Sequence, residues 1–366
     1  MEAVVIGAGQ AGPATAHALA EAGLRPVVLE ASERAAGSWP HYYDSLTLFS
    51  PARFSTLPGM PFGGDPDRYP HRDEAVAHLT AYAARLQADL RTGRRVIAVR
   101  ADGDGFTVEL EGGEQLRTGA VVAASDSFGR PHRPDLPGLE TFAGQVLHSA
   151  DYRSPTPFAG QRVAVVGAGN SAVQIAAELA REARTTLATR APVTFARQHP
   201  LGRDLHFWLT RTSLDAPLGR FLKTPPAPPV LDDGRYRAAL GAGAPDRRPM
   251  FTRLTGDRVT WADGTTERLD ALILAAGYRP RLPDLAGLDG ALDPAGHPRH
   301  RGGASPAHPG LAFAGLEWPA QPVLEHAARD RPGCRTDGPP SGRPPGPQLT
   351  PCRLGSMCVN IDVCRM

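Results

Sequence analysis

Apolar residues along the chain occur in short runs that alternate with longer amphipathic stretches. Residues 3–6 (AVVI) and 26–29 (PVVL) are continuous apolar runs, typical of strands buried on both faces of a parallel sheet. The stretch between them has small or apolar residues on one helical face. The same succession of strand, helix and strand recurs over residues 163–190. This alternation predicts an α/β fold.

Three further stretches have a regular spacing of apolar residues that predicts their secondary structure. Residues 72–90 place four apolar residues on one face and predict a scaffold helix. Residues 95–125 alternate around D-G and G-G turns, which predicts an antiparallel meander ending in a strand at 120–124. A similar hairpin over 258–280 is expected to end in a strand at 271–275.

The turn after the first apolar run has the spacing G-x-G-x-x-G, formed by Gly7, Gly9 and Gly12. Such glycines allow a tight turn, close approach of the backbone to a pyrophosphate, and close packing of the helix on the strand. The helix N-terminus then offers N–H groups to phosphates. Pro13 is tolerated because its missing N–H falls in the first turn. The first copy therefore predicts a dinucleotide site.

The second copy of this unit has Gly167 and Gly169, with Ala172 in place of the third glycine. Glu30 and Arg190 stand at the same offset from the first glycine of their own copies, at the end of the second strand. A carboxylate there accepts hydrogen bonds from ribose hydroxyls, whereas an arginine suits a 2′-phosphate. We therefore expect FAD or NAD in the first site and NADP in the second. A solvated arginine at a strand end is the alternative for Arg190.

Composition narrows the class of protein. The 366 residues predict two domains, and the charges are spread along the chain with a net charge of +2, so we expect a small-molecule partner and no nucleic acid. The first apolar run lacks a basic leader, so we expect no membrane span and a cytoplasmic location. The cysteines fit no metal site, and all lie near the end: Cys334, Cys352, Cys358 and Cys364.

Over residues 1 to about 318 the chain resembles the flavin-containing monooxygenase-like family, of the class B flavoprotein monooxygenase superfamily, and its small bacterial relatives. The resemblance rests on five stretches: GAGQAG, GSWPHYYDSL, FAGQVLHSADY, GAGNSA and AAGY. The pattern F-x-G-x-x-x-H-[ST]-x-x-Y is filled by Phe142, Gly144, His148, Ser149 and Tyr152. In the related Baeyer–Villiger enzymes the last position is typically Trp, so Tyr152 favours the branch that oxygenates heteroatoms.

The resemblance implies that NADPH reduces FAD and that the reduced flavin adds oxygen. The resulting hydroperoxide would oxygenate a small N-, S- or carbonyl-containing substrate. The implied catalytic residues are His148, Tyr152 and Trp39, the first two coupling the nucleotide sites rather than transferring protons. Trp39 could instead be a core aromatic. The candidate cofactor-binding residues are Gly7, Gly9, Gly12, Glu30, Gly37, Ser38, Trp39, Phe142, Gly144, Gly167, Gly169, Asn170, Ser171, Arg190 and Gly277.

The resulting fold class is α/β, with two Rossmann-like dinucleotide-binding domains and the NADP domain inserted in the FAD domain. We expect the FAD domain over 1–152 and 275–318 and the NADP domain over 153–274, and a homodimer is compatible with this organisation. Residues 319–366 are rich in Pro, Gly and Arg, which predicts disorder. If the coding sequence at the start of this tail is read with a shift of one nucleotide, it can encode RSPSSSTLRG, which is similar to a motif of the family. Our hypothesis is that a frameshift near residue 319 produced it.

Two departures from the family keep other functions open. Asp126 stands in a turn where the family usually has glycine, and residues 47–50 (TLFS) lack the family's asparagine. Without that amide, NADPH oxidation uncoupled from oxygenation is the alternative, as in a flavin-dependent NADPH oxidase or reductase. An inactive nucleotide-binding protein is the third reading, and the missing C-x-x-C disfavours a disulfide reductase. Phe207 and Trp208 suit a substrate pocket or a core helix equally.

Overall fold

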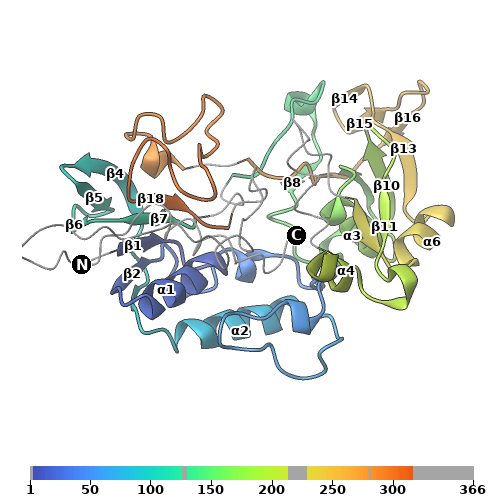
Figure 1. The fold of residues 1–366 in the computed structure, drawn as a ribbon. Helices are drawn as coiled ribbons and strands as arrows, with labels where there is room; N and C mark the ends of the chain where they lie inside the picture. The colour runs from blue at the N-terminus through green and yellow to red at the C-terminus, as the bar shows by residue number, and fades with distance from the viewer. Residues whose placement is uncertain (1–2, 126–129, 213–228, 280–281, 316–366) are drawn as a thin grey trace, which may run out of the picture.

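The computed structural model describes residues 3–125, 130–212, 229–279 and 282–315. Two five-stranded parallel sheets form two lobes (Figure 1). Asp126 and the expected tail lie outside the described residues, so the predictions made for them stay predictions.

The first sheet has the strand order β18-β7-β1-β2-β3, and all of its pairs are parallel. Its strands are β1 (Ala3–Ile6), β2 (Pro26–Leu29), β3 (Asp89–Arg91), β7 (Val121–Ala123) and β18 (Leu311–Phe313). The central strand β1 has Val5 in register with Val28 of β2 and Val122 of β7. The first glycine turn therefore leaves the sheet at its middle strand.

Both faces of the first sheet are buried, which explains its continuous apolar runs. Ala3 and Val5 face the cluster that includes helices α1 (Ala11–Glu21) and α2 (Arg72–Ala83). Val4 and Ile6 face the opposite cluster, because side chains alternate along a strand. That cluster contains the antiparallel sheet of β4 (Val96–Asp102), β5 (Gly105–Leu110) and β6 (Gln115–Thr118). The predicted meander is thereby confirmed.

The second sheet has the order β13-β10-β9-β17-β8 and is also wholly parallel. Its strands are β8 (Gln145–His148), β9 (Arg162–Val166), β10 (Arg184–Thr189), β13 (Asp246–Pro249) and β17 (Ala271–Leu274). Helix α3 (Asn170–Leu179) follows β9, so the strand, turn, helix and strand of the first copy recur as predicted.

The second sheet is buried on both faces as well. Val163 and Val165 pack with α3, whereas Ala164 and Val166 pack with Trp261 and the predicted second hairpin. That hairpin is the antiparallel sheet of β14 (Arg253–Thr255), β15 (Arg258–Thr260) and β16 (Thr266–Arg268). The lobe also contains β11 (Phe195–Arg197), α4 (Leu205–Thr212), β12 (Val230–Asp232) and α6 (Arg235–Gly241).

The helix expected over 72–90 is shorter in the structure. It ends at Ala83, and Leu90 lies in β3, in register with Val28 of β2. The apolar period continues past Ala83, but pairing with the edge of the first sheet supplies the backbone hydrogen bonds that a longer helix would have made. Tertiary contact thus overrides the local helical pattern.

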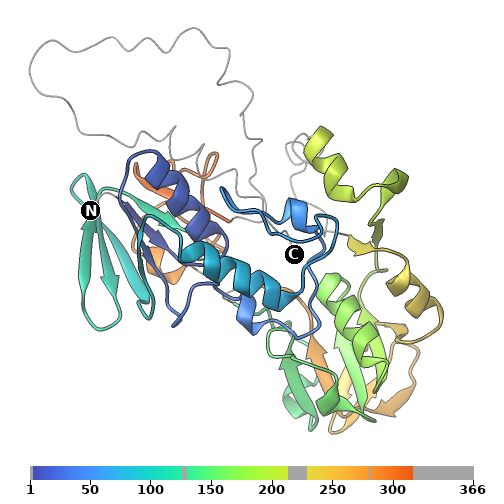
Figure 2. The same cartoon turned by 90° about the horizontal axis from the view of Figure 1, so that it is seen from below.

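The chain changes sheet earlier than the expected boundary after residue 152. Strand β8 lies within the range assigned to the first domain, yet it pairs with β17 in the second sheet. The chain returns to the first sheet after β17 and adds β18 there. The second lobe is therefore an insertion in the first, and Figure 2 shows the two lobes side by side.

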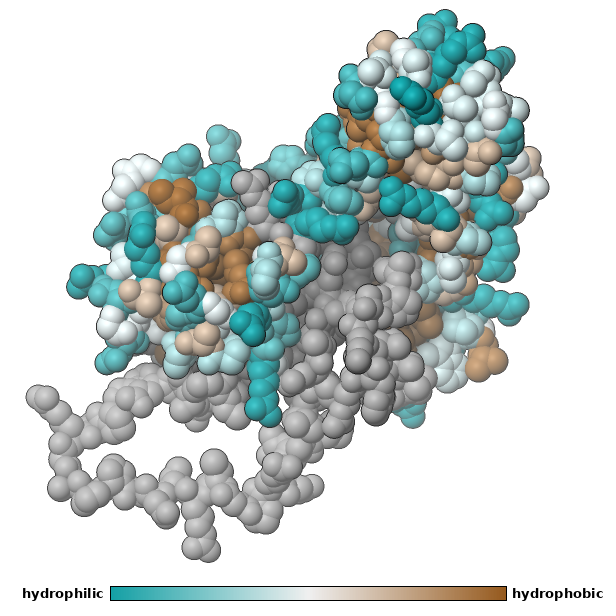
Figure 3. All heavy atoms as spheres, turned by 90° about the horizontal axis from the view of Figure 1, so that it is seen from above, coloured by the Kyte–Doolittle hydropathy of each residue, from teal (hydrophilic) through white to brown (hydrophobic). Residues whose placement is uncertain are grey.

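No helix among the described residues is long and apolar enough to cross a membrane. On the face seen in Figure 3, the coloured surface is mostly hydrophilic, and apolar residues gather only in small groups.

Candidate active site between the two lobes

A cavity of about 560 Å³ lies at the carboxyl ends of β1 and β2. Its wall includes the first glycine turn, Glu30, the 37–39 segment, and Asp284 of the short 3₁₀ helix η7 (Pro283–Leu285). Parallel α/β sheets bind ligands at this edge, where helix N-termini and strand ends converge. The geometry agrees with the dinucleotide site predicted from the first fingerprint.

The three glycines of the first turn have different surroundings. A Cβ on Gly12 would lie 1.9 Å from the carbonyl oxygen of Gly7, so helix and turn are in direct backbone contact. Gly7 has φ +101°, a conformation that favours glycine. A Cβ on Gly9 would approach only the Cα of Gly37, at 3.8 Å, and Gly9 lines the cavity. Gly12 and Gly7 thus serve packing and turn geometry, while Gly9 leaves backbone accessible to a ligand.

Glu30 lies at the end of β2 and is 7% exposed. Its Oε2 accepts a hydrogen bond from the Ala8 N–H at 2.6 Å, and its Oε1 accepts from the Ser32 N–H and hydroxyl, both at 2.8 Å. A carboxylate offers about four acceptor positions, so one is left, and Glu30 lines the cavity in which a ribose hydroxyl could donate to it. Glu30 therefore suits the role that the sequence predicted for it.

The cavity passes two further tests for a bound dinucleotide. Helix α1, which follows the first glycine turn, carries no acidic residue in its first turn, so no carboxylate competes with a phosphate at this helix N-terminus. Asp284 Oδ2 is buried without a hydrogen-bond partner among the described residues. Burial raises the pKa of Asp284 to about 6. A ligand in this cavity would meet an acid that can carry a proton near neutral pH.

The segment 37–39 lies against the first glycine turn. A Cβ on Gly37, which has φ +56°, would lie 2.7 Å from the Cα of Gly9. Ser38 lines the cavity, and its hydroxyl hydrogen-bonds the Tyr42 hydroxyl at 2.9 Å. The Trp39 indole N–H donates to Gln10 Oε1 at 3.2 Å. Trp39 is 5% exposed, so it is a buried aromatic that also borders the cavity.

A second, smaller cavity of about 30 Å³ lies where the lobes meet. The first lobe contributes Trp39, Tyr43 and residues 46–50, and α3 contributes Asn170, Ser171 and Gln174. The Tyr43 hydroxyl donates to Gln174 Oε1 across the boundary. The Asn170 side-chain oxygen accepts from the Leu231 N–H at 3.2 Å. Trp39 therefore forms part of the wall of both cavities.

His148, in the fingerprint between the copies, is completely buried. Its Nδ1 accepts from the Ala150 N–H at 3.0 Å, so Nε2 carries the proton and donates to the Gly277 carbonyl at 3.1 Å. Burial lowers the pKa of His148, although the hydrogen bond to Gly277 opposes that shift. Both ring nitrogens are occupied by backbone, and the ring joins β8 to the turn after β17. This geometry provides no free ring nitrogen for proton transfer, and the coupling of the two nucleotide sites by His148 stays a prediction.

Tyr152 is 1% exposed, and its hydroxyl donates to Glu178 Oε2 of α3 at 2.9 Å. Burial, and then the charge of Glu178, raise the pKa of Tyr152 far above its usual range. The ring lies 6.1 Å from that of Tyr43. Tyr152 thus holds α3 beside the first lobe, and neither it nor His148 lines the two cavities described above.

Phe142 and Gly144, also predicted to bind a cofactor, lie at the amino end of β8. A Cβ on Gly144 would lie 2.4 Å from the Phe142 ring and 2.6 Å from the Asp270 carbonyl oxygen. Phe142 forms an isolated bridge with Gly256 in the second hairpin. Both residues are at the opposite end of the sheet from the glycine turns and line neither cavity. The positions of Phe142 and Gly144 are therefore explained by packing.

The second glycine turn repeats the first but is less crowded at its second and third positions. A Cβ on Gly167 would lie 2.3 Å from the Ala275 oxygen, whereas a Cβ on Gly169 would meet no described atom within 4 Å. Arg190 is exposed directly after β10. Gly277, with φ +76°, follows β17, and its carbonyl accepts from the His132 N–H at 2.9 Å. These residues share the carboxyl edge of the second sheet.

Two arginines near Arg190 escaped the sequence analysis. The pKa of His132 is lowered by desolvation and then by the positive charges of Arg279, Arg190 and Arg130. The Arg279 N–H donates to the Arg130 carbonyl at 2.9 Å, which fixes their backbones together. The charges of three arginines therefore act on His132, and one of them is Arg190, which is predicted to bind a 2′-phosphate. Arg130 and Arg279 had only a weak signal in the sequence, because both lie in turns far from the second fingerprint.

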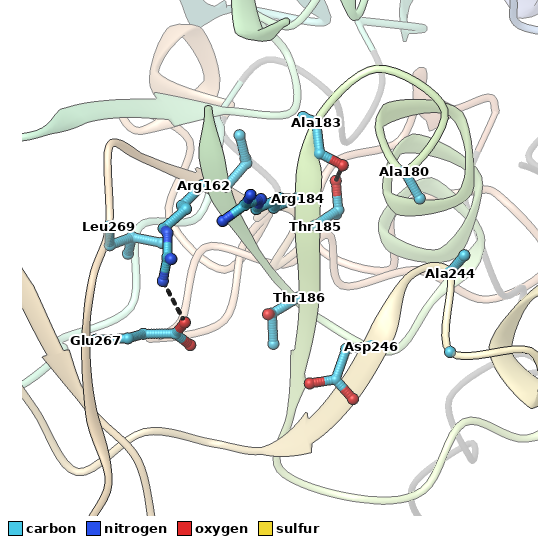
Figure 4. Close-up of a pocket in the computed structure, with 12 residues that line it drawn as sticks. Arg162, Ala180, Ala183, Arg184, Thr185, Thr186, Ala244, Asp246, Glu267 and Leu269 are labelled. Carbon is cyan, nitrogen blue, oxygen red and sulfur yellow. Dashed lines mark hydrogen bonds and ion pairs between the residues drawn. The ribbon is translucent and has the colours of Figure 1, made fainter. Parts of the chain in front are cut away.

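A third cavity, of about 330 Å³, lies at the amino ends of β9 and β10 (Figure 4). Its wall carries an ion pair between Arg162 Nη1 and Glu267 Oε2 at 3.1 Å, with Asp246 nearby. It contains no residue of either glycine turn, so we place the site at the opposite edge of the sheet. In the part of the chain that the structure describes, no group of three or more His, Cys, Asp or Glu residues could hold a metal ion.

Comparisons with known proteins agree with this geometry. A family model described as pyridine nucleotide-disulphide oxidoreductase matches residues 4–211. Indole-3-pyruvate monooxygenase YUCCA1 of Oryza sativa subsp. japonica is 33% identical over 321 residues, which cover 77% of each protein. The uncharacterized oxidoreductase CzcO-like of Geobacillus kaustophilus is 29% identical over 325 residues, covering 87% of this chain and 91% of that protein.

A solved structure is similar in both sequence and fold. The flavin-containing monooxygenase from Stenotrophomonas maltophilia is 33% identical, with a TM-score of 0.76. The match covers 88% of this chain and 92% of that chain. The similarity therefore extends over both lobes.

Proposed function

Because the chain belongs to the flavin-dependent monooxygenases within the pyridine nucleotide-disulphide oxidoreductase family, we propose that it oxygenates a small N-, S- or carbonyl-containing compound with molecular oxygen. The chain is an oxidoreductase, and its cofactors are FAD and NADPH. When bound, FAD receives reducing equivalents from NADPH and supplies the oxygen chemistry. The task of the protein is to bind and orient the cofactors and the substrate and to exclude water from them.

The first cavity has the groups that FAD requires. The Gly9 backbone and the N-terminus of α1 would receive the pyrophosphate, and Glu30 would accept from a ribose hydroxyl. Gly37 and Ser38 would border the cofactor on the side of the second lobe. Asp284, which carries a proton more readily than an ordinary aspartate, would face an acceptor atom of the ligand.

The second site has the groups that NADPH requires. Gly169 and the N-terminus of α3 would hold the pyrophosphate, and Arg190 would bind the 2′-phosphate. Arg130 and Arg279 add positive charge around His132. Tyr152 would keep the two sites in register, because it contacts both α3 and Tyr43 of the first lobe, and His148 would fix the turn after β17 on β8 within the second lobe.

The position of Trp39 carries the proposal. Trp39 lies in the wall of the first cavity and in the wall of the cavity between the lobes, so a substrate in the second would lie beside the flavin. Leucine and aromatic residues of the first lobe form the other side, which favours an apolar substrate and excludes water. The cavity has room for about one or two water molecules. Substrate binding therefore requires the side chains around it to move.

Incorporation of oxygen tests this proposal. The purified protein would be reconstituted with FAD and supplied with NADPH and ¹⁸O₂. We would offer indole-3-pyruvate, because a relative is named for it, together with a thioether and a tertiary amine. We expect one labelled oxygen atom in the product of at least one class. A protein that takes up FAD, consumes NADPH and labels none of these compounds contradicts the proposal.

An NADPH oxidase without oxygenation is the second candidate. The observation that favours it is the Leu48–Phe49 part of the cavity wall, which lacks the asparagine of many relatives. Against it, α3 places the amides of Asn170 and Gln174 in the same wall. Release of one hydrogen peroxide per NADPH in the presence of every substrate class would establish the oxidase. The cytoplasmic location and the homodimer stay predictions.

A further inference from the structure

The Asp204 carboxylate is the centre of a polar network outside the two cofactor sites. Its side chain is 9% exposed and accepts four hydrogen bonds. Tyr69 donates its hydroxyl at 2.5 Å, Gln198 its amide at 2.7 Å, and His206 both its backbone N–H and its Nδ1–H at 2.8 Å. Burial raises the pKa of Asp204, but the hydrogen bonds from His206, Tyr69 and Gln198 outweigh it and bring the pKa down to about 2. The carboxylate is therefore ionised and satisfied.

The network joins segments from both lobes. Tyr69 belongs to the long loop between β2 and α2 in the first lobe, whereas Gln198, Asp204 and His206 belong to the second. The Tyr69 hydroxyl also hydrogen-bonds His199 Nε2 at 2.9 Å. A buried ionised carboxylate with four donors is costly to expose, so these contacts hold the lobes at a defined separation.

The same residues hold one wall of the cavity between the lobes. The Gln198 amide that donates to Asp204 also donates to the Phe49 carbonyl at 2.9 Å. The His206 ring is stacked on the Phe49 ring at 5.8 Å and on the Phe54 ring at 6.1 Å. Phe49 is itself part of the cavity wall. Two contacts, one polar and one aromatic, therefore fix this residue, and neither Gln198 nor His206 is part of the cavity wall.

We infer that Tyr69, Gln198, Asp204 and His206 are positioning residues for substrate, because they set the place of the Phe49 wall beside Trp39. The inference rests on the proposed function for the identity of the cavity's ligand. The network decides how well the wall closes on an apolar substrate and keeps water out. It contacts neither glycine turn, so it acts on substrate affinity and coupling rather than on FAD binding.

An exposed ion pair in the same loop shows why the network differs from ordinary surface charge. Arg53 and Asp67 lie 2.6 Å apart, but their side chains are 42% and 71% exposed. Such a pair contributes little, because water screens both charges. Asp204 combines burial with four donors from two lobes, which makes it sensitive to single substitutions.

The test compares Asp204→Asn and Tyr69→Phe with Asp293→Asn as the control. Asp293 also accepts hydrogen bonds from two backbone N–H groups and a histidine, but all within one exposed loop. In Asp204→Asn we expect the substrate KM to rise about 10-fold and the peroxide released per NADPH to rise about threefold or more. NADPH oxidation without substrate and the FAD content should stay within about twofold. Tyr69→Phe, which removes one donor, should show the same pattern with a smaller amplitude.

Hydrogen exchange gives a readout independent of activity. Residues 46–55 should exchange faster in both variants than in the wild type and in Asp293→Asn, while the strands of both sheets keep their protection. Unchanged exchange there, with unchanged KM and peroxide release, overturns the inference. A lower melting temperature with uniform loss of protection also overturns it, because that result indicates a purely structural role. If the wild type oxygenates nothing, the proposed function fails, and the exchange of residues 46–55 still decides this inference.

Discussion

The two glycine fingerprints are similar in sequence but differ in how closely the following helix packs on the turn. In the first copy a Cβ at Gly12 would lie 1.9 Å from the Gly7 oxygen, so the helix touches the turn. In the second copy Ala172 occupies the same place, and its Cβ would lie 3.0 Å from a Cβ on Gly167. At this third position the first turn requires glycine, whereas the second leaves room for a methyl group.

The strand ends differ in charge and burial in the same way. Glu30 is buried and anchored by Ala8 and Ser32, whereas Arg190 is exposed with further arginines near it. The first strand end is thus held by packing and hydrogen bonds, whereas the second presents positive charge to solvent. This contrast suits a cofactor that stays bound and one that is exchanged in each turnover.

Substitution of Gly12 by alanine should have the largest effect. The new methyl group cannot share space with the Gly7 carbonyl, so we expect a loss of about 3 kcal/mol or more in the free energy of unfolding, and a colourless protein. Urea unfolding and absorbance at 450 nm measure the two effects. Gly169→Ala is the matched control, because its methyl group meets no described atom within 4 Å. A yellow, stable Gly12→Ala protein would contradict the packing difference.

Charge reversal at Arg190 comes next. We expect Arg190→Glu to lower kcat/KM for NADPH by about 10- to 100-fold, because charge-assisted hydrogen bonds to the 2′-phosphate are lost. FAD content should not change, since the first site is built separately. Arg184→Glu, an exposed position at the opposite end of β10, is the control. Equal losses in both variants would show that Arg190 acts only through general charge.

The pH dependence of stability should report on Asp284. Its pKa in the folded state, about 6, is above the value of about 3.9 expected for the unfolded chain. The stability from the neutral form is fully present below pH 4 and is lost as pH rises through 6. Asp284→Asn should therefore gain about 2 to 3 kcal/mol relative to wild type between pH 4 and pH 8. Urea unfolding at both pH values measures the gain, and a pH-independent difference would contradict it.

The smallest effect is expected for Ala172→Gly, which makes the second fingerprint resemble the first. Glycine in the first turn of α3 should cost at most about 1 kcal/mol in the free energy of unfolding. The KM for NADPH should stay the same, because the second turn already accepts alanine at this position. Thermal unfolding and steady-state kinetics check both points. A large gain in stability would mean that the two turns pack alike.

Local patterns accounted for most of the fold. The two apolar runs and the glycine spacing predicted β1, α1 and β2, and the repeat predicted β9, α3 and β10. The alternating stretches predicted both antiparallel sheets. These elements were readable because strand and helix periods, and the demands of a glycine turn, depend on residues close in sequence. The predicted helix over 72–90 was too long for the opposite reason. Its last part lies in β3, and β3 forms only by pairing with β2, which is distant in the sequence.

The sequence by itself determined that this protein has two dinucleotide-binding units, one ending in an acid and one in a base. Only the tertiary structure decided what lies between them. Strand β8 joins the second sheet, Tyr43 meets Gln174, and Tyr69 meets Asp204, each from distant parts of the chain. No local period encodes such contacts, because they arise when two lobes with separate cores pack together. The glycine turns and their strand ends were therefore visible in the sequence, and the cavity between the lobes was not.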